Sequence, residues 1–146
     1  MGLFDFLKKE EKKEEKKPVR KLEDNREILK KEFVTIFVRD DEVPYHDPRV
    51  DMDVMLSVRA DIQIFAPAPD EDEVKKAAIE CYRSVFGAIS GQVSVSEFNK
   101  APHNNQIRNA MMDYMREHGF DIKYISIGFM SYNKESNEKV NGKPVL

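Results

Sequence analysis

The sequence predicts a single α+β domain, in which an antiparallel or mixed sheet of three to four strands carries two main helices on one face. Three observations support this fold class. Residues 53–65 alternate apolar and polar side chains, residues 74–89 repeat apolar side chains at helical spacing, and strand periodicity returns after Gly119. The chain has 146 residues, about the length of one domain.

The first predicted strand covers residues 33–39, which read FVTIFVR. Its β-branched and aromatic side chains occupy both faces, a pattern typical of a strand covered on both sides. Residues 40–48 contain turn-forming aspartates and two prolines, Pro44 and Pro48, which lack a backbone donor. We therefore expect a loop over residues 40–48, with room for a short extended piece.

The second predicted strand, residues 53–65, shows the clearest pattern in the chain. Its alternation is long enough for a strand that bends or carries a bulge, with one face on the core and the other in water. Pro67 and Pro69 end it. The first helix is then expected to begin at Asp70, in a capping-box-like arrangement with Glu73, and to end at Ser90.

A second helix is predicted after Pro102, capped by Asn104 or Asn105 and ended by Gly119, a favourable residue for a left-handed C-cap. The last strand is expected over residues 120–130. Its predicted inner face consists of Ile125, Ile127 and Phe129.

Charge divides the chain into three parts. Residues 1–31 have a net charge of +3, residues 32–132 of −7 and residues 133–146 of +1. We interpret 1–31 as a charged, flexible N-terminal segment, 32–132 as the folded domain, and 133–146 as a disordered C-terminal tail. An acidic folded domain without a basic stripe argues against nucleic acid as a partner.

The start of the chain reads MGLFDFLKK, a short apolar stretch followed by lysines. Such a segment can rest on an anionic membrane surface as an amphipathic anchor. The alternative is a frayed terminus, and Phe6 stands where a myristoylation motif requires Ser or Thr. The predicted membrane-contact residues are Leu3, Phe4, Phe6, Leu7, Lys8 and Lys9.

No apolar run is long enough to span a bilayer, and no secretory signal is expected. The single cysteine, Cys81, excludes an internal disulfide and suits a reducing compartment. We therefore expect a cytoplasmic protein, peripheral to the inner face of the membrane if the anchor binds. Cys81 lies within the apolar helical stripe, so we interpret it as a small buried residue and not as a nucleophile.

The pattern of polar residues does not indicate an enzyme, a cofactor or a metal site. His46, His103 and His118 lack the spacing of zinc ligands. Asp47, Asp51 and Asp53 are better explained as a charge cluster beside a loop than as a calcium loop, because the glycine and final glutamate of that motif are missing. There is no phosphate-binding loop or nucleophile elbow.

Three stretches that together cover about residues 33–130 resemble the band 7 domain, also called the SPFH or prohibitin-homology domain, of stomatins, prohibitins and flotillins. They are VPYHDPRVDMDVMLSVRADIQIFAP, CYRSVFGAIS followed by VSVSEFNK, and IRNAMMDYMREHGFDIKYISIGFM. The resemblance implies a non-enzymatic domain of membrane-associated, oligomeric scaffolds. That family usually adds a membrane segment and a coiled coil, and we expect neither here, so the resemblance supports the fold more than the assembly.

These observations lead to a functional expectation. The protein is expected to be a small scaffold or adaptor that self-associates or docks protein partners, with contact to an anionic membrane through its first residues. The alternative is a monomeric small-molecule-binding or regulatory domain, which would show a closed apolar pocket between helices and sheet.

Overall fold

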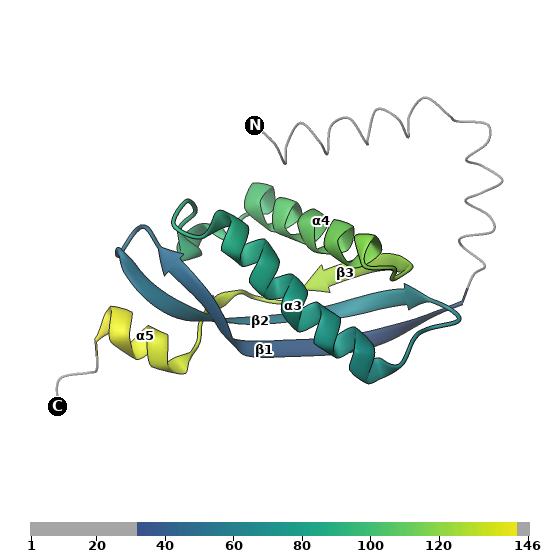
Figure 1. Cartoon of the computed structure of the whole chain (residues 1–146). Coiled ribbons are helices and arrows are strands. Elements are labelled where there is room, and N and C mark those ends of the chain that lie inside the picture. The colour runs from purple at the N-terminus through teal and green to yellow at the C-terminus, as the bar shows by residue number, and fades with distance from the viewer. Residues whose placement is uncertain (1–31, 143–146) are drawn as a thin grey trace, which may run out of the picture.

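The computed structural model describes residues 32–142, so the predicted flexible segment 1–31 lies outside the described residues (Figure 1). Within residues 32–142, four strands form one antiparallel sheet in the order β1-β2-β3, and a short β4 also pairs with β2. The predicted α+β class with an antiparallel sheet is confirmed. The strands are β1 (Phe33–Asp47), β2 (Met52–Phe65), β3 (Ile122–Ile127) and β4 (Ser131–Tyr132).

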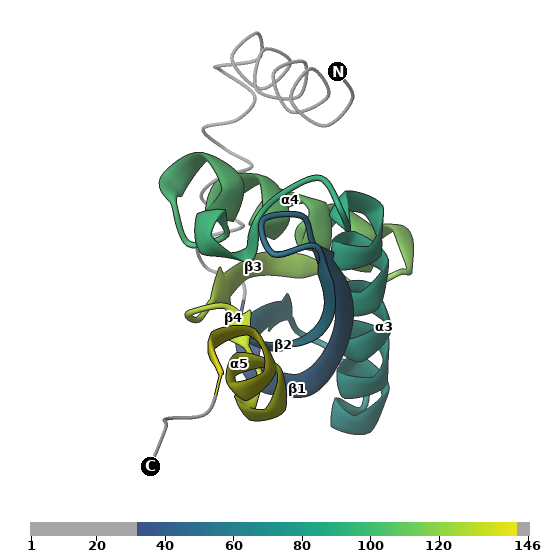
Figure 2. The ribbon, with the colours of Figure 1, turned by 90° about the vertical axis from the view of Figure 1, so that its left-hand side faces the viewer.

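Two long helices pack on one face of this sheet, α3 against β1 and α4 against β3 (Figure 2). A 3₁₀ turn, η1, connects them, and a third helix, α5, follows β4. The bounds are α3 (Glu71–Ile89), η1 (Val95–Glu97), α4 (Ala101–Glu117) and α5 (Lys134–Asn141).

The inner face of β2 provides the centre of the core. Every second residue from Val54 to Ile64 is buried beneath the helices, as the alternation predicted. Aromatic rings close one end of this core: Tyr45 packs edge-on against Phe86 and Phe98, with ring centroids 6.3 and 5.1 Å away. Burial of these large apolar side chains supplies the main driving force for folding.

Strand β1 differs from its prediction, because residues 40–47 continue the strand instead of forming a loop. Two features allow this. Pro44 lies on an edge strand, where a missing backbone donor costs little. Between Asp40 and Val43 the strand carries a bulge, in which β1 uses one residue more than β2.

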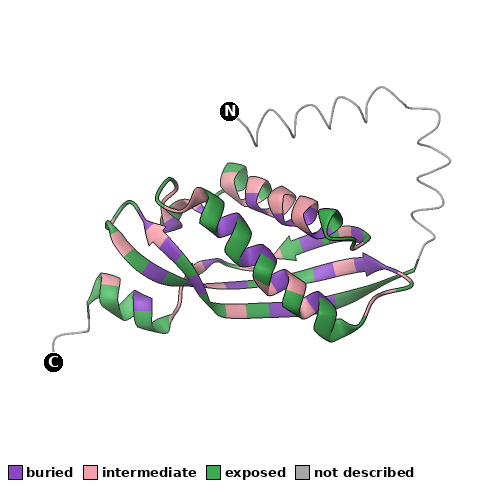
Figure 3. Ribbon diagram, viewed as in Figure 1, coloured by how far each residue is buried: buried purple, intermediate pink, exposed green. Residues whose placement is uncertain are grey.

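The strand is also not covered on both sides. Among residues 32–142, neither α3 nor α4 packs over the outer face of the sheet, and Phe33 and Phe37 are exposed there, as the exposed positions along β1 show (Figure 3). The two phenylalanines of the first predicted strand, Phe33 and Phe37, therefore do not form part of the core.

The boundaries of α3 agree with the prediction and those of α4 do so at its C-terminal end, but the expected N-caps do not form. Asp70 is the N-cap of α3, yet its side chain makes no capping hydrogen bond. Helix α4 begins at Ala101, before the expected Asn104 or Asn105, because Pro102 fits the first turn of a helix. Gly119 has the predicted left-handed conformation, with φ at 90°.

The predicted strand over residues 120–130 is divided into β3 and β4. Ile125 is buried as expected, Ile127 is partly buried, and Phe129 is exposed, because it lies in the irregular stretch between the two strands. The Asn99 side chain fixes this stretch: its amide donates to the Met130 carbonyl at 2.8 Å and its oxygen accepts from the Met130 amide at 2.9 Å.

Residues 134–141 form helix α5 and not the disordered tail expected from composition. Asn133 caps the helix by accepting from the Ser136 amide at 2.9 Å. The helix lies along an edge of β2: the Asn133 amide donates to the Met55 carbonyl at 2.8 Å, and the Met55 amide donates to Ser136 Oγ at 2.7 Å. Helix α5 therefore completes the hydrogen bonding of β2 beyond β4.

Candidate interaction surface

The outer face of the sheet gathers exposed aromatic and charged side chains on neighbouring strands. Phe37 is 53% exposed and Phe129 is 67% exposed, values that place both rings in solvent. Folding does not account for this exposure, because large apolar side chains gain free energy only when they leave water. We call this surface the outer patch, consisting of Phe33, Phe37, Arg39, Arg59, Asp61 and Phe129.

Two arginines lie at the centre of the outer patch. Arg39 and Arg59 are direct cross-strand partners in the β1–β2 register, an arrangement of like charges that weakens a sheet. Arg39 Nε donates to Asp41 Oδ1 at 2.9 Å, and this hydrogen bond is the main cause of a lowered pKa for Asp41. A pair of arginines held together on neighbouring strands favours binding to carboxylates.

Gly128 lets the Arg59 side chain lie close to the backbone that follows β3. A Cβ added at Gly128 would stand 2.9 Å from Arg59 Cγ, too close for an unshifted side chain. The Gly128 amide also donates to the Arg59 carbonyl at 2.9 Å. Arg59 lines two small hollows of the outer face, one together with Phe37 and the other together with Phe129.

The outer patch carries both signs of charge. Asp61 is the cross-strand partner of Phe37 and lies two residues along β2 from Arg59, so both point to the outer face. At the end of β1, Lys123 Nζ lies 4.5 Å from the centre of the Phe33 ring. The surface can thus offer apolar contact, cations and a carboxylate on one face of the sheet.

A second candidate surface is a groove between α3 and α4 of about 560 Å³. Val85, Ile89 and Ile107 line it, and the short side chains of Ala88 and Ala110 leave it open. Its volume lies within the range of small-molecule sites, but it opens between the helices and is not the closed pocket between helices and sheet that a ligand-binding domain would show. The space between the helices and the sheet is filled by the core.

The ends of the groove differ in charge. His103 and Gln106 line one end, and Asp113, Tyr114 and Glu117 line the other. Burial, and then the charge of nearby Glu80, raises the pKa of Tyr114, so its hydroxyl stays protonated. The second end therefore contains two carboxyl side chains, those of Asp113 and Glu117.

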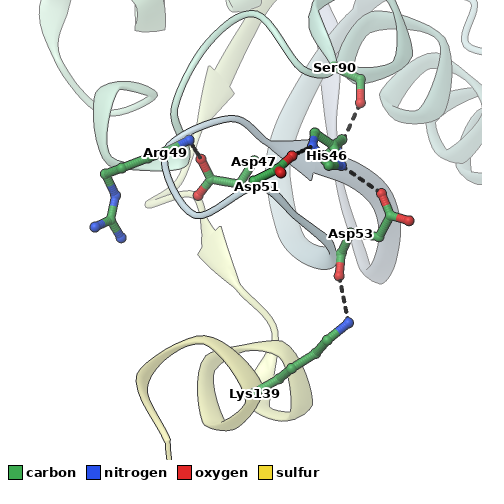
Figure 4. A network of polar contacts seen from close by, with 7 residues as sticks. All are labelled: His46, Asp47, Arg49, Asp51, Asp53, Ser90 and Lys139. Carbon is green, nitrogen blue, oxygen red and sulfur yellow. Dashed lines mark hydrogen bonds and ion pairs between the residues drawn. The ribbon is translucent and has the colours of Figure 1, made fainter.

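The structure brings together three of the polar residues noted in the sequence at the β1–β2 turn (Figure 4). His46 Nδ1 lies 2.8 Å from Asp53 Oδ1, and His46 Nε2 lies 2.9 Å from Asp51 Oδ1. These hydrogen bonds, first to Asp53 and then to Asp51, raise the pKa of His46. These two hydrogen bonds hold the residues of the turn together, and we call His46, Asp51 and Asp53 the His46 clasp. The turn is also attached to Ser90, the C-cap of α3, because the His46 amide donates to Ser90 Oγ at 2.9 Å.

Asp47 is separate from this clasp and is fully buried. It accepts hydrogen bonds from the Arg49 amide and from the Tyr132 hydroxyl, and so connects the turn to β4. Within residues 32–142, no group of three or more His, Cys, Asp or Glu side chains is arranged to hold a metal ion.

Cys81 is fully buried, as the helical stripe predicted. Burial raises the pKa of its thiol to about 12, so the thiolate needed for nucleophilic chemistry is not formed near neutral pH. Its Sγ donates to the Met111 carbonyl at 3.7 Å, a contact between α3 and α4. Cys81 therefore contributes to packing between the helices.

The predicted membrane-contact residues cannot be placed. Leu3, Phe4, Phe6, Leu7, Lys8 and Lys9 all lie outside the described residues, and membrane contact stays a prediction. In the part of the chain that the structure describes, no helix has the length and apolar character needed to cross a membrane.

The sequence pattern does not reveal the outer patch, because it predicts that Phe33 and Phe37 belong to a strand covered on both sides.

The fold and its surfaces define a class: an α+β domain with two long helices on one sheet face and exposed aromatic and charged side chains on the opposite face. No protein-family model matches the chain, and a search of curated proteins finds no match.

Proposed function

We propose that this protein is a cytoplasmic, non-enzymatic scaffold domain that self-associates by stacking the outer patches of two copies. The observation that carries the proposal is the exposure of Phe37 and Phe129 on the sheet face opposite the two long helices. Exposed aromatic side chains gathered on one face are typical of protein interfaces, in which arginine is also enriched. The resemblance to the band 7 family, whose members form oligomeric scaffolds, supports the same function.

Charge complementarity favours a second copy as the occupant. Arg59 and Asp61 lie two residues apart on the outer face of β2. When two copies of one strand stack about a two-fold axis between these residues, Arg59 of each copy lies over Asp61 of the other. The patch is then self-complementary, which is the requirement for an interface between identical surfaces.

The first experiment measures the solution mass of the full chain by light scattering across a concentration series. We expect the mass to rise above the 17.0 kDa of one chain. Phe37→Ser combined with Phe129→Ser should restore the monomer mass, because the apolar contact is lost. Val34→Ser is the matched control, since Val34 is 41% exposed but points to the opposite face of β1.

A charge exchange tests the stacking itself. Arg59→Asp alone places like charges opposite each other and should weaken association, as should Asp61→Arg alone. The double variant restores opposite charges and should recover the assembly. Failure of the double variant to recover it would contradict stacking through these residues. A monomer at every concentration would overturn the proposed function and favour the monomeric ligand-binding or regulatory alternative.

A further inference from the structure

The groove between α3 and α4 is an apolar surface without an occupant among residues 32–142. We propose that its occupant is the apolar segment of the same chain at residues 3–7, bound within the chain. The proposal does not depend on the outer patch, because the groove lies on the helical side of the sheet.

The shape of the groove fits a short apolar segment. Val85, Ile89 and Ile107 form its apolar lining, while Ala88 and Ala110 lack the side-chain volume to fill the space between the helices. A groove of about 560 Å³ can hold a few large side chains, and residues 3–7 supply two phenylalanines and two leucines in five positions. Docking would remove these side chains and the groove lining from water at the same time.

Charge fixes the direction of the segment. Residues 3–7 are followed by Lys8 and Lys9, and the groove ends at Asp113 and Glu117. More broadly, residues 1–31 have a net charge of +3 and the folded residues 32–132 of −7. Placing the lysines at the acidic end brings opposite charges together, so we expect the apolar residues to lie toward His103.

The tether between segment and groove is long enough. Residues 8–31 lie between them, and at roughly 3.3 Å for each extended residue they reach about 80 Å, several times the length of α4. The tether joins the domain near the end of the groove that contains Glu117. The Ala66 amide donates to the Glu32 carbonyl at 2.8 Å, and the adjacent Phe65 amide donates to the carbonyl of Asp121, which lies four residues after Glu117. A tether of this kind gives a high effective concentration, which makes a weak contact well populated.

One side chain of the groove has an unused donor that a peptide would match. Gln106 Nε2 is shielded from solvent and has no hydrogen-bond partner within residues 32–142. A buried donor without a partner costs free energy, and an extended peptide presents backbone carbonyls as acceptors. A small rotation of the Gln106 amide toward the groove would allow it to donate to the bound segment.

The consequence of this contact is control over the apolar residues. While residues 3–7 occupy the groove, Phe4 and Phe6 are withheld from any other surface, whether a membrane or another protein. The domain then regulates its own apolar segment by competition.

The test uses the full chain with the photo-crosslinking residue p-benzoylphenylalanine in place of Phe6. After illumination, mass spectrometry should find crosslinks to α3 and α4 residues of the groove within one chain. Ala88→Arg, at an exposed position of the lining, should abolish these crosslinks, because it blocks the groove and repels the lysines. Ala101→Arg is the matched control, since it places the same side chain at an exposed position of α4 outside the groove.

A second measurement does not depend on the crosslinker. Amide NMR shifts of the groove residues should change when Phe4 and Phe6 are both replaced by serine, and the shifts of the outer patch should not. Crosslinks that fall outside the groove, join two chains, or survive Ala88→Arg would overturn the proposal. Identical groove shifts in the wild type and the serine variant would do the same.

Discussion

Along β2, alternate side chains lie in opposite environments on the same backbone. Leu56 and Ile62 point toward the helices and are at most 1% exposed, whereas Met55, Arg59 and Asp61 point away and are exposed. The inner face explains stability, since burial of its apolar side chains drives folding. The outer face carries aromatic and charged groups that folding does not require. Side chains with a role beyond folding are therefore expected on the face opposite α3 and α4.

The largest expected effect comes from the inner face. Leu56→Ala should lower the free energy of unfolding by about 2–5 kcal/mol, because a fully buried side chain is replaced by a cavity. Urea denaturation measures the change. The adjacent Met55→Ala, at a 40% exposed residue, is the control and should lose clearly less. Equal losses at both positions would contradict the difference between the faces.

The next effect tests whether α5 belongs to the fold. Ser136→Ala removes the acceptor of the Met55 amide and should destabilise the protein by about 1–3 kcal/mol, the cost of a shielded donor without a partner. Hydrogen exchange of the Met55 amide should also become faster. Glu138→Ala, on the exposed side of the same helix, should change neither quantity. Unchanged exchange in Ser136→Ala would mean that α5 does not protect this edge of β2.

A smaller effect is expected on the outer face. Phe37→Ser should change the free energy of unfolding by about 1 kcal/mol or less, since the ring is mostly in solvent and only strand preference is lost. Thermal and urea denaturation of the monomeric state measure it. A loss comparable with that of Leu56→Ala would show that Phe37 supports the core, and would remove it as evidence for an interface.

The smallest effect is a pH dependence at the His46 clasp. Because Asp53 and Asp51 raise the pKa of His46 above its ordinary 6.5, the protonated clasp stabilises the fold fully below pH 6.5. This contribution is lost as the pH rises through the raised pKa. NMR titration of the His46 ring measures that pKa, and Asp51→Asn with Asp53→Asn should bring it back toward 6.5. Titration of the wild-type ring at or below 6.5 would contradict the clasp.

Much of the fold could be predicted because its periodicity is regular. The alternation over residues 53–65 reflects one uninterrupted strand with helices on one side, and the apolar stripe of α3 reflects one uninterrupted helix. The second half of β1 could not be predicted this way. Asp40, Pro44 and Pro48 are typical of turns, and only pairing with β2 keeps residues 40–47 extended.

Helix α5 was missed for a related reason. Its residues KESNEKVN bury only Ser136, so no apolar stripe marks them, and the helix is held mainly by hydrogen bonds to β2. The outer patch is a property of tertiary structure: Phe37 and Val38 are both apolar in the sequence, and only the position of α3 makes one solvent-facing and the other core. Periodicity detects which residues share a face but not which face is covered.

The bulge in β1 changes which alternate residues of the strand face the core. Before it, even-numbered residues such as Ile36 and Val38 face the core; after it, the odd-numbered Val43 and Tyr45 do. Removing one residue between Asp40 and Val43 would leave both halves of β1 paired with β2 as they are. The alternation of core-facing and solvent-facing side chains would then be regular along the whole strand. The strand therefore has one position where a change of length conserves every core contact of β1, and at every other position such a change would turn the core side chains outward.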